Sequence, residues 1–114
     1  MRVVFSDRQN RHSPPLRAIV DTGADGTLAP LLLLKQAGFR PGRQRRRLLS
    51  GKSNSPAEMV AGYLLDLKMG PLEWFDIEVY GSRELSDVII GRNLLNQLVF
   101  TYNGPGRWLE ILDS

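Results

Sequence analysis

The residues best suited to chemistry lie near position 21, where an apolar stretch ends in an acid, a hydroxyl and a glycine. Residues 18–25 read Ala-Ile-Val-Asp-Thr-Gly-Ala-Asp. A carboxyl delivered by an apolar strand, as Asp21 is here, is expected to be buried, which is costly unless the group is hydrogen-bonded or protonated. Thr22 offers a hydroxyl, and Gly23 allows close approach of the backbone. Because Asp-Thr-Gly also marks ordinary turns, the string alone leaves a catalytic and a structural role open.

Several other chemistries lack the residues they need. The chain contains no cysteine, which removes disulfides, thiolate metal sites and cysteine nucleophiles. Its only histidine, His12, precedes two prolines in a polar turn, so neither a histidine-rich metal site nor a Ser-His-Asp triad is expected. Paired carboxylates would also suit a glycosidase, but nothing in the sequence indicates a sugar-binding cleft. We therefore predict no metal and no cofactor.

The elements that must position this segment are mostly short strands separated by turn residues. We predict strands over Val3–Phe5, Leu16–Val20, Met59–Met69, Phe75–Val79 and Val88–Ile90. Alternation with a period of two assigns one face of the long strand to six residues: Met59, Ala61, Tyr63, Leu65, Leu67 and Met69. The next strand repeats the pattern, with Phe75, Ile77 and Val79 inward and Asp76 and Glu78 outward. The apolar run Val88–Ile90 suits a strand buried on both faces.

Helix signals are few. Pro30 followed by four leucines, with Gly38 beyond, predicts a short helix opened by proline and closed by glycine. Residues 91–96 predict a helical turn or two, and a final hairpin is expected from Leu98–Tyr102, a turn at 103–106 and Trp108–Leu112. Many short strands with little helix predict an all-β, barrel-like fold, and the length predicts a single domain over residues 1–114.

A second informative segment lies far downstream. Residues 87–95 read Asp-Val-Ile-Ile-Gly-Arg-Asn-Leu-Leu. Together with residues 18–25, this motif resembles the retroviral-type (retropepsin-like) aspartic peptidases, in a bacterial-type single-domain form. The resemblance covers roughly residues 16–102, with the motifs in the family's order and at about its spacing. It implies a retropepsin-like acid protease barrel with one short helix after the Ile-Ile-Gly motif, assembled as a homodimer.

The resemblance also implies roles for individual residues. Asp21 corresponds to the catalytic aspartate, and Thr22 to the residue whose hydroxyl locks the two active-site loops together across the dimer axis. A mobile hairpin flap is expected at residues 48–56, although this segment is poorer in glycine and apolar residues than the retroviral flap tip. Substrate contacts are implied for Gly23, Ala24, Asp25 and, near the flap tip, Gly51.

Four residues of the second motif are implied to support the catalytic loop. Ile89, Ile90 and Gly91 correspond to the motif packed behind it, and Arg92 to the arginine that pairs with Asp25. Two interpretations of the pair stay open. The Asp25–Arg92 ion pair either braces the loop only, or also leaves Asp25 to bind the substrate main chain.

One count predicts the assembly. Peptide hydrolysis of this type uses two carboxyls that share a proton, as is established for aspartic proteases as a class. The sequence contains a single Asp-Thr-Gly and no Asp-Ser-Gly, so the second carboxyl must come from another chain. We therefore predict a homodimeric aspartic endopeptidase acting on peptide or protein substrates. The family resemblance further implies apolar side chains flanking the cleaved bond. The alternative is a catalytically silent dimeric domain that binds peptides on the same fold.

The charge is unevenly distributed. Residues 1–57 hold eleven Lys/Arg and three Asp/Glu, whereas residues 58–114 hold four and nine. The densest run, Arg43–Arg47, contains no aromatic residue to stack on bases, which favours a solvated strand edge or loop over a polyanion contact.

The chain has no stretch of about 20 apolar residues and no signal-peptide pattern. We therefore expect a cytoplasmic protein that contacts neither membrane nor nucleic acid.

Overall fold

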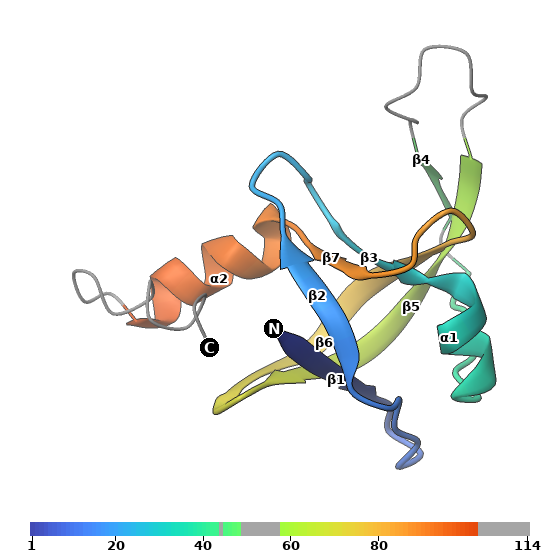
Figure 1. Cartoon of the computed structure of the whole chain (residues 1–114), viewed down its shortest axis with the longest axis horizontal. Coiled ribbons are helices and arrows are strands. Elements are labelled where there is room, and N and C mark those ends of the chain that lie inside the picture. Colours follow the sequence, from blue (N-terminus) through green and yellow to red (C-terminus); the bar gives the residue numbers. More distant parts are fainter. Residues whose placement is uncertain (44, 49–57, 103–114) are drawn as a thin grey trace.

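The chain forms a mostly-β barrel with two short helices in a computed structural model, which describes residues 1–43, 45–48 and 58–102 (Figure 1). In chain order the elements are β1 (Arg2–Ser6), β2 (Leu16–Val20), β3 (Thr27–Pro30), α1 (Leu31–Gln36), β4 (Arg45–Leu48), β5 (Glu58–Met69), β6 (Leu72–Ser82), β7 (Val88–Ile90) and α2 (Arg92–Tyr102).

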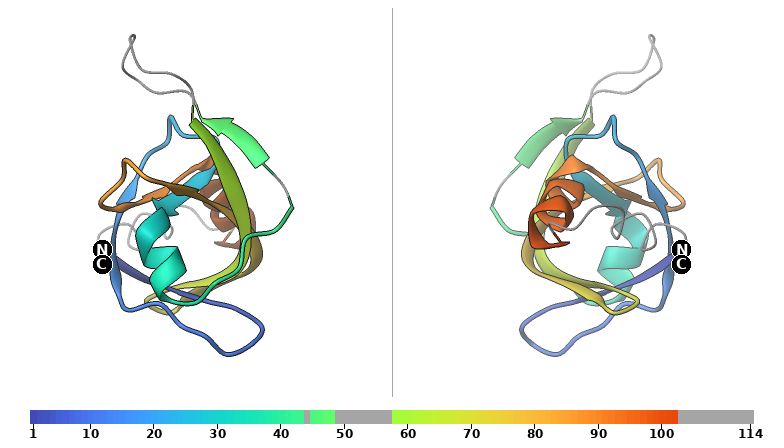
Figure 2. Two further views of the ribbon diagram at one scale, coloured as in Figure 1. Left: turned by 90° about the vertical axis from the view of Figure 1, so that its right-hand side faces the viewer. Right: turned by 90° about the vertical axis from the view of Figure 1, so that its left-hand side faces the viewer.

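Six strands close the barrel. They follow the order β1-β2-β7-β3-β6-β5, and an additional pairing between β1 and β5 joins the two ends of the sheet. Within the described ranges, β4 pairs with β5 alone, so it is an edge strand that extends from the barrel together with the start of β5 (Figure 2). The all-β barrel predicted from the sequence is confirmed, and the arginine-rich run does include an edge strand.

The core fills the barrel interior through the alternation of each strand. In β2, Leu16 and Ala18 are buried while Arg17 and Ile19 face outward. The two helices each add a fully buried leucine to the same core, Leu34 from α1 and Leu94 from α2. The proline-opened helix is present as predicted, with Gly38 at a φ of 86° just beyond its end.

The predicted strand Phe75–Val79 lies within β6, but the inward direction predicted for Phe75 is wrong. Trp74 is buried, whereas Phe75 is 66% exposed and Asp76 is exposed beside it. Asp76 adopts a φ of 52°, and the pairing of β5 with β6 shifts register between Leu65 and Leu67. Two consecutive outward residues are the signature of a β-bulge, which reverses the alternation that the period of two predicts.

The long strand β5 follows the prediction only inside the barrel. Tyr63, Leu65, Leu67 and Met69 are buried as expected. Met59 is instead exposed, because the first residues of β5 extend past the barrel and pair with β4.

The predicted strand at Leu98–Tyr102 is also wrong, because α2 continues to Tyr102. No glycine or proline lies between Arg92 and Tyr102 to end the helix, and the next such residue is Gly104. The remainder of the predicted hairpin, residues 103–112, lies outside the described residues. Among the described helices, none is long and apolar enough to cross a membrane.

Candidate active site

The barrel brings the two sequence motifs together. Strand β7 lies between β2 and β3, parallel to β2 with Ile19 opposite Ile89 and antiparallel to β3. Residues 21–26, which we call the Asp21 loop, connect β2 to β3, and α2 begins where β7 ends (Figure 1). The Asp21 loop therefore lies against the start of α2, although 60 or more residues separate them along the chain.

Backbone hydrogen bonds fix the Asp21 loop to the second motif. The Asp21 N–H donates to the Ile90 carbonyl at 3.0 Å, which extends the β2–β7 ladder by one residue. The Arg92 N–H donates to the Ala24 carbonyl at 2.8 Å, and the Asn93 N–H donates to the Asp25 carbonyl at 3.3 Å. The first N–H groups of a helix have no partner within the helix, so the loop carbonyls cap α2 while α2 holds the loop.

The Asp21 side chain is held by its own loop and faces solvent. Its Oδ1 accepts a hydrogen bond from the Gly23 N–H at 2.9 Å, and its carbonyl accepts one from the Ala24 N–H at 3.1 Å. The expectation that this carboxyl is buried is wrong for the single chain, in which residues 21–23 are all exposed. The apolar run ends at Val20, and the chain then leaves the barrel, so Asp21 lies at the rim.

Gly91 allows the two motifs to approach this closely. A Cβ added at Gly91 would lie 2.8 Å from the Ala24 carbonyl oxygen and still closer to the carbonyl of Gly26. Backbone atoms cannot yield as a flexible side chain would, so only glycine fits. The structure thus places Ile90 and Gly91 directly against the Asp21 loop.

A buried hydroxyl, which the sequence did not point out, completes this contact. Thr27 is fully buried, and its Oγ1 accepts a hydrogen bond from the Gly91 N–H at 3.4 Å and donates one to the Asn93 Oδ1 at 2.9 Å. Because the Gly91 N–H and the Asn93 Oδ1 both bond to this one hydroxyl, we infer that Thr27 is a positioning residue. The available signal was Asn93 within the Gly-Arg-Asn-Leu-Leu motif, since an asparagine there needs a polar partner.

The Asp25 and Arg92 side chains lie in contact, with the Arg92 Nη2 donating to the Asp25 Oδ1. Both side chains remain well exposed, at 66% for Asp25 and 54% for Arg92. Because the Asp25 side chain is mostly exposed, a ligand can reach it while Arg92 orients it. An exposed ion pair of this kind contributes little to stability.

An apolar surface lies beside Asp21, on the outward face of β2 and β7. Ile19 is 43% exposed and stands opposite the half-buried Ile89. One step further from Asp21, the Arg17 Nε lies 3.8 Å from the Asp87 Oδ2. Moving away from the carboxyl, the two strands present an apolar cross-strand pair and then a charged one.

Gly51 and the predicted flap at 48–56 fall almost entirely outside the described residues, apart from the backbone of Leu48 at the end of β4. Strand β4 and the start of β5, which flank that segment in the sequence, extend from the barrel (Figure 2). Over residues 1–43, 45–48 and 58–102, no group of three or more His, Cys, Asp or Glu side chains is arranged to hold a metal ion.

Comparisons with known proteins agree with this fold. A family profile described as "Aspartyl protease" matches residues 9–94. A retropepsin-like aspartic protease from Rickettsia conorii superposes with a TM-score of 0.53 at 16% identity, covering 83% of this chain and 77% of the other. The EIAV protease complexed with the inhibitor HBY-793 gives a TM-score of 0.57 at 17% identity, covering 86% and 85%. Comparison with curated protein sequences gives no match.

Proposed function

Because the chain belongs to the aspartyl protease family, we propose that it is an aspartic endopeptidase that hydrolyses peptide bonds as a homodimer. The observation that carries the proposal is the exposed Asp21 carboxyl on a loop fixed by hydrogen bonds to Ile90, Arg92 and Asn93. A reactive group needs a constrained position, and the contacts with the second motif provide it. The retropepsin-like fold of the structural neighbours agrees with this activity.

The proposed mechanism requires two copies of Asp21. Each chain supplies one Asp-Thr-Gly loop, and a twofold axis would bring the second loop opposite the first. The two carboxyls would share one proton because like charges about 3 Å apart cannot both ionise. The ionised carboxyl takes a proton from water, which attacks the peptide carbonyl, while the protonated one donates to the carbonyl oxygen. The C–N bond of the resulting tetrahedral intermediate then breaks as the newly protonated carboxyl gives its proton to the leaving amine. The newly ionised carboxyl takes a proton from a hydroxyl of the intermediate as the carbonyl reforms, which restores one shared proton between the two carboxyls.

The neighbouring residues would bind and align the substrate. The Thr22 hydroxyl, exposed beside Asp21, is proposed to join the two loops across the axis. Gly23, Ala24 and Asp25 form the exposed or half-buried edge along which an extended peptide would pair with the backbone. The predicted contact at Gly51 remains part of the proposal.

The surface beside Asp21 favours an apolar side chain next to the cleaved bond. Ile19 and Ile89 stand opposite each other on this surface, and apolar area removed from water contributes about 25 cal/mol per Å². The Arg17–Asp87 pair bounds the apolar surface on the side away from Asp21.

The direct test is Asp21→Asn, assayed on a peptide library together with the wild type. The amide cannot act as the base, so we expect kcat to fall by roughly 10³-fold or more. The free energy of unfolding and the sedimentation coefficient should stay unchanged. The matched control is Asp76→Asn, which makes the same change at another exposed aspartate. Asp76 lies at the β-bulge of β6 and is paired with Arg8. Turnover retained in Asp21→Asn would contradict the proposal, and peptide binding without cleavage by the wild type would support the silent-domain alternative.

A further inference from the structure

A concave surface lies outside the Asp21 loop. It is a groove of about 440 Å³ between α1 and the segment that connects β6 to β7. That volume lies within the usual range of ligand sites. The groove is lined by Pro30, Leu31, Leu32, Leu33, Lys35, Ser82, Arg83, Leu85 and Ser86.

The groove is lined mainly by apolar residues, together with two cations. Five of its nine lining residues are leucine or proline, and Leu32 is 65% exposed on α1. Its two charged residues are Lys35 and Arg83, both exposed, and no acidic residue lines it. Neither cation forms an ion pair with any described residue. Exposed apolar area beside two unneutralised cations is complementary to a ligand that is both apolar and acidic.

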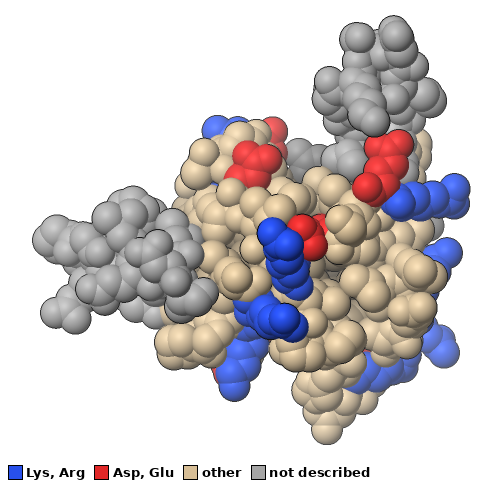
Figure 3. All heavy atoms as spheres, viewed as in Figure 1, with Lys and Arg blue, Asp and Glu red and all other residues tan. Residues whose placement is uncertain are grey.

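Further cations follow α1 along the chain. Arg40 and Arg43 are exposed, and residues 26–43 contain three Lys/Arg and no acid. Figure 3 shows Lys and Arg side chains along the edge of the molecule where Figure 1 places α1. A partner approaching this edge would therefore meet a positive surface, which favours acidic segments and speeds their association.

We propose that this groove binds an apolar, acidic segment of the protein substrate, outside the cleft in which the bond is cut. The inference rests on the proposed peptidase function. A peptide segment fits better than a nucleic acid, because the apolar part of the lining is aliphatic and no aromatic side chain lines the groove for base stacking. Binding there would raise the local concentration of a cleavable segment at the Asp21 loop.

The segment that connects β6 to β7 links the groove to the candidate active site. Arg83, Leu85 and Ser86 line the groove, and Asp87 follows directly to meet Arg17 beside the Ile19–Ile89 surface. A substrate held in the groove would therefore contact the same short segment that borders the cleft. Protein substrates that carry the acidic segment should bind more tightly than short peptides with the same cleavage sequence.

The test measures binding separately from cleavage. The probe is a fluorescein-labelled peptide of alternating glutamate and leucine, titrated by fluorescence anisotropy against full-length Asp21→Asn protein, which cannot cut it. We expect saturable binding that weakens roughly tenfold or more in Lys35→Glu/Arg83→Glu. The control, Arg40→Glu/Arg43→Glu, makes the same total change of charge at exposed cations outside the groove and should weaken binding far less.

A third variant tests the apolar lining. Leu32→Gln changes an exposed side chain, so the fold should persist, and binding should weaken several-fold. Equal binding by the two double variants, or displacement of the probe by a short peptide substrate without acids, would overturn the proposal. The proposal would also be overturned if the peptide does not bind but anionic vesicles or an oligonucleotide do, and if their binding is lost in Lys35→Glu/Arg83→Glu.

Kinetics in the wild-type enzyme complete the test. Appending the acidic segment to a cleavable peptide should lower KM at least about fivefold without changing kcat, and Lys35→Glu/Arg83→Glu should abolish that gain. The same double variant should cut the short peptide as the wild type does. Failure of the wild type to cut any peptide would contradict the proposed function, whereas absence of probe binding in an active enzyme would contradict this inference alone.

Discussion

Two aspartates follow directly after strands of the barrel, and they differ in their ion pairing and exposure. Asp7 follows β1 and Asp21 follows β2, and each Oδ1 accepts a hydrogen bond from the N–H two residues on, at 3.0 Å from Gln9 and 2.9 Å from Gly23. The two turns thus begin with the same local geometry, in which the side chain replaces a backbone acceptor.

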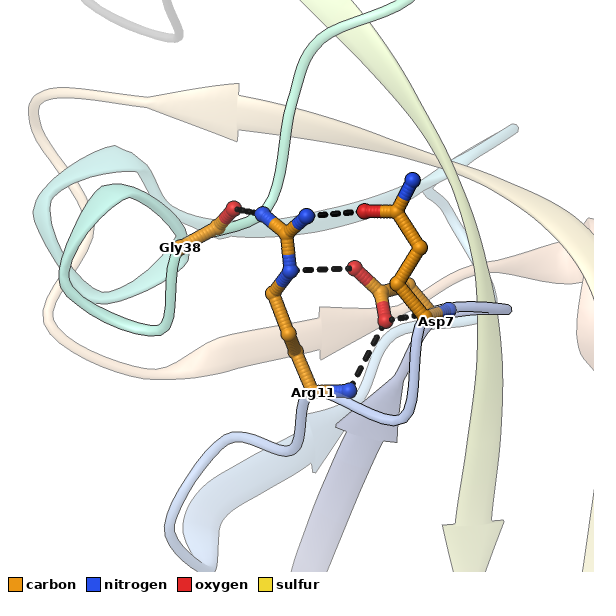
Figure 4. A network of polar contacts seen from close by, with 4 residues as sticks. Asp7, Arg11 and Gly38 are labelled. Atoms are coloured by element: carbon orange, nitrogen blue, oxygen red, sulfur yellow. Dashed lines mark hydrogen bonds and ion pairs between the residues drawn. The ribbon is translucent and has the colours of Figure 1, made fainter.

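The difference lies in the cation. Asp7 also accepts from the Arg11 N–H at 2.9 Å, and the Arg11 Nε lies 3.6 Å from its other oxygen, while the Arg11 guanidinium contacts the Gly38 carbonyl (Figure 4). The Asp7 side chain is only 16% exposed. Asp21, in contrast, is exposed and forms no ion pair with a described residue. One carboxylate braces a turn against the end of α1, and the other is left available.

The largest expected effect falls on the contact that supports Asp21. Gly91→Ala places a methyl group against the carbonyls of Ala24 and Gly26, which are backbone atoms. We expect a loss of about 3 kcal/mol in the free energy of unfolding, or failure to fold, measured by urea titration. Gly42→Ala, whose Cβ would meet the Gly62 carbonyl oxygen at 3.3 Å, should cost far less. Equal losses would show that the Asp21 loop can move aside.

Thr27→Val should be next in size. The valine keeps the shape of the side chain but leaves the buried Gly91 N–H and Asn93 Oδ1 without their partner. An unsatisfied buried polar group costs about 1–3 kcal/mol, and the Asp21 loop would lose its alignment, so both stability and kcat should fall. Thr27→Ser retains the hydroxyl and is the control. A valine variant with wild-type kcat would contradict the positioning role.

Asp7→Asn should affect stability alone. The asparagine still accepts from the Gln9 and Arg11 N–H groups but loses the charge that Arg11 faces, so we expect a loss of about 1 kcal/mol. Peptide cleavage should be unchanged, in contrast with Asp21→Asn. Thermal unfolding and a peptide assay on the same preparation measure both, and a large loss of kcat would remove the distinction between the two turns.

The smallest effect on stability is expected at Arg92→Gln. Its ion pair with Asp25 is exposed, so the loss should be at most about 1 kcal/mol. KM for a peptide substrate separates the two interpretations of the pair. A several-fold rise in KM, reproduced in Asp25→Asn, would indicate that Asp25 binds substrate. An unchanged KM in both variants would indicate that the pair only braces the loop.

Sequence patterns predicted the elements that carry the candidate site. Leu16–Val20 matches β2 and Val88–Ile90 matches β7, because both short strands consist mostly of apolar residues and so have a clear signal. The two motifs also identified the loop and helix start that the structure brings together. Both the Ile19–Ile89 pairing and the Arg92–Asp25 contact connect residues named from the sequence.

The patterns failed where long-range contacts or backbone conformation decide the outcome. The bulge at Asp76 depends on how β5 and β6 align, so the sequence alone did not place Phe75 outward. Strand β3 at Thr27–Pro30 has only four residues and was not predicted, and its buried Thr27 hydroxyl has partners more than 60 residues away. The helix α2 was predicted too short, because the apolar residues after Asn96 also suit a strand.

The central claim is that catalysis needs the Asp21 carboxyl of both chains. Mixing wild-type and Asp21→Asn chains at a fixed total concentration, with full exchange of subunits, tests it most directly. If both carboxyls are required, an equal mixture should retain about a quarter of the wild-type activity, because about a quarter of the dimers hold two intact chains. Activity that falls in direct proportion to the wild-type fraction, leaving about half, would contradict the claim.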